Sequence, residues 1–116
     1  MLYSYNMSTE TNQDRVFKAL SAGVRRAILD ALKDAPRTTG ALCEAFRPLD
    51  RCTVMQHLKV LEEADLIIVQ RKGRERWNHL NPLPIKEVHD RWIGPHAARA
   101  VEVLGRLKRD LEVAPD

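Results

Sequence analysis

The spacing of hydrophobic positions divides this chain into stretches of different character. Spacings of three and four, typical of one face of a helix, run through residues 16–20, 24–32 and 54–61. A stretch rich in branched residues, LIIVQRK, then leads through a glycine into RERWNHL, which is typical of a β-hairpin. Helical spacing resumes at residues 93–111. The pattern predicts three helices, an amphipathic fourth helix, a hairpin and a long last helix.

Turn and capping residues set the expected boundaries of the first three helices. We expect the first helix to start near Asp14, after a disordered lead-in of residues 1–13. The second helix should end before Pro36, because proline cannot continue a helix. Thr38 or Thr39 can cap a short third helix.

The fourth helix carries two different faces. Asp50 is a suitable N-cap for a helix of residues 51–64, and Val54, Leu58 and Leu61 share its apolar face. A helix of this kind can pack on a core and present polar groups to the DNA major groove. An ordinary solvated helix surface is the alternative. The candidate DNA-contacting residues are Arg51, Cys52, Thr53, Met55, Gln56 and Lys59.

The distribution of charge favours DNA binding, because the positive charge is concentrated in the hairpin. The chain has a net charge of +3. The segment QRKGRER, residues 70–76, holds four cations and one anion, so it alone carries that excess, whereas residues 81–116 hold six cations and six anions. A basic hairpin beside a recognition helix can bind phosphates as a wing. The candidate wing residues are Arg71, Lys72, Arg74 and Arg76.

The fold class that follows is mainly α with a β wing. Residues 14–82 should form a winged helix-turn-helix, and residues 83–116 a long C-terminal dimerisation helix that Pro95 bends or restarts. The last helix has a heptad seam, and an uncovered seam of this length predicts a homodimer. The seam consists of Ile93, Ala97, Ala100, Leu104, Leu107 and Leu111.

Length and composition limit the other possibilities. A chain of 116 residues predicts one domain. No apolar run is long enough to span a membrane, and the polar N-terminus does not read as a signal peptide, so we expect a cytoplasmic protein with no membrane partner.

Residues 16–80 resemble the ArsR-type family of bacterial repressors. ALSAGVRRAILDAL is similar to the family's opening, TVMQHLKVLEEADLI to its recognition helix and RKGRERW to its wing. Met55 stands where the family usually has serine, and Asp65 where it usually has glycine. The resemblance implies a nucleoid-associated regulator, most often a repressor, that binds an inverted repeat in double-stranded DNA as a homodimer. It also implies dimerisation through the first and last helices, which adds Val16, Leu20 and Trp92 to the seam.

The metal sites of the family are not matched. GALCEAF holds the single Cys43 where the family's third-helix site has paired cysteines. His89, Asp90 and His96 lack the spacing of the last-helix site. We therefore expect no metal and no cofactor.

Two alternatives and one exclusion remain. Cys52 lies outward at a helix N-terminus beside Arg51, which would favour its thiolate and allow a redox-responsive regulator. A winged helix that binds another protein is the other alternative, and salt-dependent DNA binding would separate the two classes. Cys52 and His57 point in different directions on one helix, so no nucleophile and base pair up, and we expect no enzyme.

Overall fold

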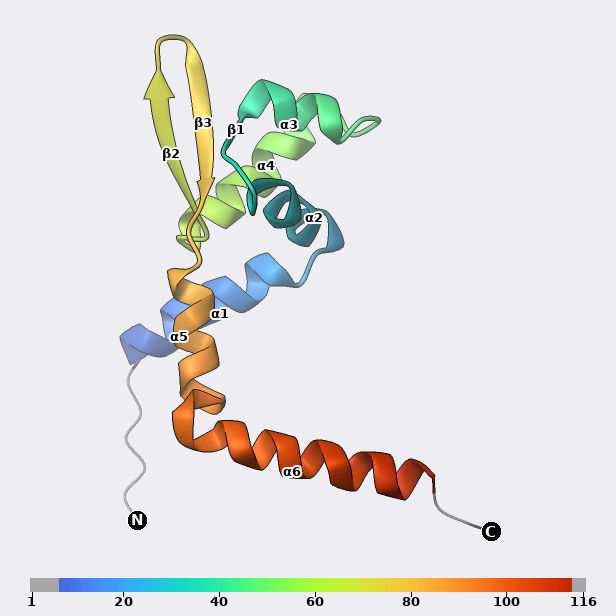
Figure 1. The fold of residues 1–116 in the computed structure, drawn as a ribbon. Coiled ribbons are helices and arrows are strands. Elements are labelled where there is room, and N and C mark those ends of the chain that lie inside the picture. The colour runs from blue at the N-terminus through green and yellow to red at the C-terminus, as the bar shows by residue number, and fades with distance from the viewer. Residues whose placement is uncertain (1–6, 114–116) are drawn as a thin grey trace. The chain divides into compact units, whose positions relative to one another are not determined.

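The computed structural model describes residues 7–113, without the side chains of residues 95 and 96. The chain divides into two compact units, residues 1–85 and residues 86–116. The helices are α1 (Met7–Leu20), α2 (Gly23–Leu32), α3 (Thr39–Ala45), α4 (Arg51–Glu63), α5 (Leu83–Trp92) and α6 (Gly94–Glu112), and the strands are β1 (Arg37–Thr38), β2 (Ile67–Lys72) and β3 (Glu75–Leu80) (Figure 1).

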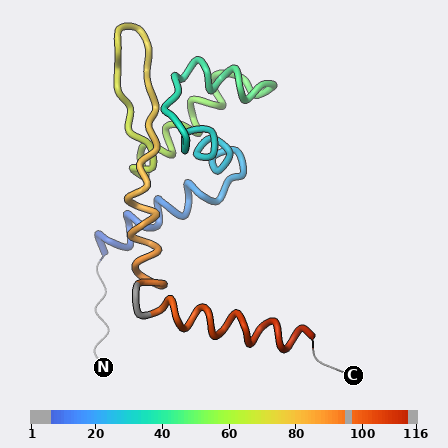
Figure 2. Tube along the Cα trace, viewed as in Figure 1, coloured from blue at the N-terminus to red at the C-terminus, as the bar shows by residue number. Residues whose placement is uncertain are grey.

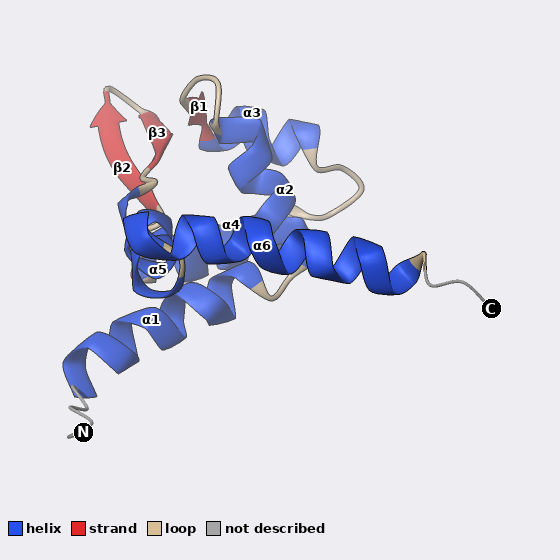
Figure 3. Cartoon of the chain, turned by 60° about the horizontal axis from the view of Figure 1, so that its bottom comes forward, coloured by secondary structure: helices blue, strands red, loops and turns tan. Residues whose placement is uncertain are grey.

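The first unit is a winged helix-turn-helix, as the sequence predicts. Its helices pack around one small core. Its three strands, red beside the blue helices in Figure 3, form a single antiparallel sheet in the order β1-β3-β2. The hairpin of β2 and β3 projects away from the helices of this unit (Figure 2). The fully buried side chains include Ile28, Leu42, Val54, Leu61, Leu66 and Ile67.

Helix α1 begins at Met7, seven residues before the expected start at Asp14. The expected disordered lead-in is therefore helical over residues 7–13, and residues 1–6 lie outside the described residues. Residues 7–13 are polar and show no hydrophobic periodicity, but Gln13 is buried on the same face as Val16 and Ala19. Tertiary packing thus extends a helix that hydrophobic spacing alone does not show.

The turn from α4 into the sheet is built by a residue with unusual backbone geometry. Asp65 has a φ of +58°, in the left-handed region that favours glycine. The Asp65 N–H donates to the Glu62 carbonyl at 3.0 Å, and the Leu66 N–H donates to the Leu61 carbonyl at 3.0 Å. These two bonds form a Schellman motif, which ends α4 and starts β2 within three residues.

The last helix is broken, as Pro95 predicts. Helix α5 ends at Trp92, and α6 restarts at Gly94, whose φ is +43°. None of the described side chains of α6 is buried, and Leu104, Leu107 and Leu111 are each more than half exposed. The described part of the chain contains no helix long and apolar enough to cross a membrane.

Candidate nucleic-acid interface

Helix α4 begins where the sequence predicts. An Asp50 side-chain oxygen, Oδ1, accepts a hydrogen bond from the Thr53 N–H at 2.7 Å. This bond from the Thr53 N–H, followed by the Thr53 side chain, lowers the pKa of Asp50. The cap fixes the first turn of the helix, which is the part that would enter a DNA groove.

The two faces of α4 also lie as expected. Val54 and Leu61 are fully buried and Leu58 nearly so. The side chains proposed to face DNA lie on the other side: Arg51, Cys52, Gln56 and Lys59 are exposed, and Thr53 and Met55 are half-buried.

The hairpin beside α4 turns through Gly73 and Arg74. Lys72 pairs with Glu75 across a two-residue turn, and Gly73 at its first position has a φ of +63°. Glycine there is typical of the type II′ turn, which matches the twist of the strands.

The strand register divides the wing cations between two faces. Arg71 and Arg76 lie directly opposite each other, and the pairs in line with them are Val69 with Asn78 and Ile67 with Leu80. Because alternate residues of a strand face opposite sides, Lys72 lies on the other face. There the Lys72 ammonium lies 5.8 Å from the centre of the Trp77 ring, a cation–π contact.

A groove between α3, α4 and the wing gathers positive charge. It has a volume of about 320 Å³. Arg51 of α4 and Arg71, Arg74 and Arg76 of the wing line it, together with Glu75. Four arginine residues therefore line one groove, and arginine is a side chain suited to phosphate because it binds phosphate through a planar set of donors. We call this the arginine groove.

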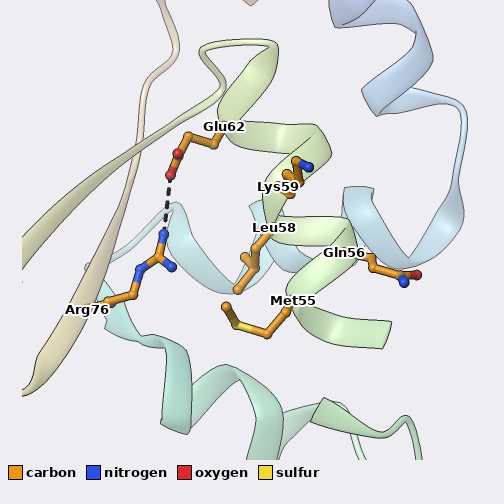
Figure 4. Close-up of a pocket in the computed structure, with 6 residues that line it drawn as sticks. All are labelled: Met55, Gln56, Leu58, Lys59, Glu62 and Arg76. Carbon is orange, nitrogen blue, oxygen red and sulfur yellow. Dashed lines mark hydrogen bonds and ion pairs between the residues drawn. The ribbon is translucent and has the colours of Figure 1, made fainter. Parts of the chain in front are cut away.

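Arg76 also lines a second groove. This groove, of about 350 Å³, is lined by Met55, Gln56, Leu58, Lys59, Glu62 and Arg76 (Figure 4). The Arg76 Nη2 atom lies 3.5 Å from Oε2 of Glu62, and the two form an ion pair from the wing to α4. Arg76 is therefore half-buried against the recognition helix, unlike the exposed Arg74 at the tip.

The chain has relatives over this region. A family model described as a helix-turn-helix domain matches residues 20–70. The "HTH-type transcriptional regulator Rv2034" of Mycobacterium tuberculosis is 41% identical over 66% of this chain and 70% of that protein. The chain belongs to the helix-turn-helix (HTH-type) transcriptional regulators.

Two further proteins are similar to this regulator. The "Transcriptional repressor SdpR" of Bacillus subtilis is 35% identical over 64% of this chain and 81% of that protein. The solved structure of an "ArsR-like Transcriptional Regulator from Rhodococcus sp. RHA1" matches with a TM-score of 0.67, at 24% identity, over 89% of this chain and 95% of that one, a likeness of fold. The regulator is thus a DNA-binding protein and not an enzyme.

An arginine anchors α4 of this regulator to the end of α1. Arg25 donates to the Ala19 carbonyl at 2.8 Å and to the Lys18 carbonyl at 2.9 Å. Its Nη1 lies 3.0 Å from His57 Nδ1, which must accept because arginine has only donors. Burial, and then the charge of Arg25, lower the pKa of His57. His57 is therefore a structural residue of α4.

Asn78 is a positioning residue that sequence reasoning missed. It is 1% exposed, on the inner face of β3. Its Nδ2 donates to the Arg37 carbonyl at 3.2 Å and to Thr39 Oγ1 at 3.1 Å. The side chain thus ties the wing to β1 and to the start of α3. Placing it opposite Val69 in the hairpin register would have shown that it faces inward.

The expected dimer residues fall into two groups. Val16 is only 3% exposed and belongs to the core of the first unit, so it offers no surface to a second copy, and Leu20 is half-buried. Trp92 and Ile93 are exposed, and so are the leucines of the seam; Ala97 is partly exposed and Ala100 exposed. Val101 and Val103, outside the predicted seam, add exposed apolar surface to α6.

The two cysteines are both free. Cys52 is exposed and Cys43 is half-buried. Among the described residues, no three histidine, cysteine or acidic side chains gather where they could hold a metal ion. His89 Nδ1 lies 3.4 Å from Asp90 Oδ1 on α5, and the side chain of His96 is not among those that the structure describes.

Proposed function

We propose that this regulator is a repressor that binds an inverted repeat in double-stranded DNA as a homodimer. The observation that carries the proposal is the arginine groove between α4 and the wing. A recognition helix in the major groove would bring the adjacent phosphates toward that groove. The similarity to a protein named a transcriptional repressor supports repression as the outcome of binding.

The residues divide by the contacts they would make. Gln56 can bond an adenine edge and Arg51 a guanine edge or a phosphate. Thr53 and Met55 would contact the DNA backbone or a thymine methyl group, and Lys59 would contact a phosphate. Cys52, which is exposed between Arg51 and Thr53, would lie close to the DNA backbone.

The wing would supply phosphate contacts through its inner face and its tip. Arg71 and Arg74 line the arginine groove, whereas Lys72 lies on the opposite face over Trp77. Lys72 should therefore contribute less to binding than Arg74 does, although the two residues carry the same charge.

A second copy of the chain is the proposed cover for α6. Val101, Leu104, Leu107 and Leu111 are each more than half exposed. Ion pairs between Arg106 and Glu102 and between Lys108 and Glu112 lie along the same helix. An amphipathic helix with an uncovered apolar side favours self-association, and two-fold symmetry in the protein favours an inverted repeat in the DNA.

Selection from a pool of randomised DNA duplexes tests the proposal. We expect an enriched inverted repeat with half-sites about one helical turn, ~10 bp, apart or a multiple of that. Light scattering should give the mass of a dimer at micromolar concentration. Enrichment of a single asymmetric half-site, or a monomer mass, would reject the dimer, and no binding to any duplex would reject the DNA-binding role.

A further inference from the structure

The contact between Glu62 and Arg76 joins the two elements that would bind DNA. Glu62 is in the last turn of α4, and Arg76 is on the inner face of β3. Their charged atoms lie 3.5 Å apart, which is long for a charge-assisted hydrogen bond. The side chains are 35% exposed for Arg76 and 49% for Glu62, so the pair is accessible to a competing anion.

The surroundings of Arg76 offer it a second position. Arg76 and Met55 are the residues that line both the arginine groove and the groove containing Glu62. The Arg76 Nε atom is buried and has no hydrogen-bond partner, so the contact with Glu62 leaves the guanidinium incompletely satisfied. A phosphate oxygen in the arginine groove would be a competing acceptor for the same group.

We propose that Glu62 is a positioning residue, which holds Arg76 away from DNA until a phosphate is placed firmly in the arginine groove. Random DNA docks loosely, so the gain from one more phosphate contact does not exceed the loss of the ion pair. A matching site docks α4 closely, and the closer phosphate takes Arg76. The ion pair is broken only on the matching site, so Glu62 lowers the affinity for that site by the free energy of the pair and the affinity for random DNA by less. This inference rests on the proposed function.

The salt dependence of binding separates this role from a structural one. Each phosphate contact contributes about 0.9 to the slope of log K against log salt concentration. In the wild type, Arg76 should contribute to that slope on the selected duplex but not on a random one. In Glu62→Gln, Arg76 is released and should contribute on both. Because Glu62 is half-exposed, the substitution should leave the fold intact, and thermal unfolding can verify this.

The experiment measures affinity and salt slope on two probes, a random-sequence duplex and the duplex selected by the wild-type protein. For Glu62→Gln we expect affinity for the selected duplex to rise about two- to five-fold, the range set by loss of one partly exposed ion pair, and affinity for the random duplex to rise by less. The salt slope on the random duplex should steepen by about 0.9, with no change in slope on the selected duplex. Glu63→Gln, on the same helix and with the same change in charge, should leave both slopes unchanged.

A double variant shows whether Glu62 acts through Arg76. In an Arg76→Gln background, Glu62→Gln should have no further effect on the slope. Equal effects of the two glutamate variants would reduce the result to net charge and overturn the inference, as would weaker binding by Glu62→Gln or an effect that persists without Arg76. A selection that enriches no sequence would instead reject the proposed function, and the random-duplex comparison would still report whether Glu62 restrains Arg76.

Discussion

Replacing Asp65 with glycine should stabilise the protein. Asp65 occupies the left-handed region, with a φ of +58°, at the junction of α4 and β2. The contacts at this turn belong to its backbone, which donates to the Glu62 carbonyl at 3.0 Å and accepts from Asn81 Nδ2 at 2.8 Å. Glycine keeps these backbone bonds and removes the strain of the Cβ atom.

The size of the effect follows from two opposing terms. The left-handed conformation costs an L-residue about 1–2 kcal/mol, and aspartate is among the residues that tolerate it best. Glycine loses about 0.5–1 kcal/mol more backbone entropy than alanine does on folding. The free energy of unfolding should therefore rise by about 0.5–1 kcal/mol, which moves the Tm of a domain of this size upward by about 2–6 °C.

Thermal and urea unfolding of matched variants provide the assay. Asp65→Asn removes the charge but keeps the Cβ atom, and it should give a smaller rise than Asp65→Gly does. Gly73→Ala is the reverse experiment, because Gly73 has a φ of +63° and nothing lies within 4 Å of an added Cβ. It should lower the free energy of unfolding by about 1 kcal/mol through backbone strain alone. If Asp65→Asn stabilises as much as Asp65→Gly, repulsion from the negative end of α4 and not backbone strain is the cause, and the reasoning is refuted.

Three other predictions concern the DNA-binding unit. Arg74→Ala should weaken binding to all duplexes and flatten the salt slope by about 0.9, whereas Gln56→Ala should cost about 1–3 kcal/mol on the selected duplex only, as competition titrations would show. The pKa of His57 is lowered in the folded protein, so the free energy of unfolding should fall as the pH drops below about 6.5, the pKa of histidine in the unfolded chain. Thermal melts between about pH 7.5 and 5.5 should show a smaller loss in His57→Gln than in the wild type. A maleimide adduct should abolish DNA binding by the wild type but not by Cys52→Ser, and equal loss in both would place the damage elsewhere.

Local signals in the sequence were sufficient for the recognition helix and the hairpin. The Asp50 cap, the spacing of Val54, Leu58 and Leu61, and the glycine of the turn each depend on neighbours close in the chain. Such features can be predicted because capping, helical period and turn conformation are properties of short segments.

Features that depend on distant contacts were missed. Strand β1 has only two residues and exists because Arg37 and Thr38 pair with Asn78 and Trp77, about forty positions later. The helical start at Met7 likewise requires packing of Gln13, a polar residue that no hydrophobic period would include. Neither element has a pattern of its own.

In the wing, the number of cations predicts a basic surface, whereas the strand register predicts which face of the hairpin each cation occupies. Nothing in the composition of the basic run distinguishes Arg71, Lys72, Arg74 and Arg76 from one another. A two-residue turn of Gly73 and Arg74 already requires that Arg71 lie opposite Arg76 and Lys72 opposite Glu75. The face that receives each cation could therefore be predicted once the turn was assigned. That Glu62 meets Arg76 could not, because this contact depends on the angle at which the left-handed turn at Asp65 leads α4 into β2.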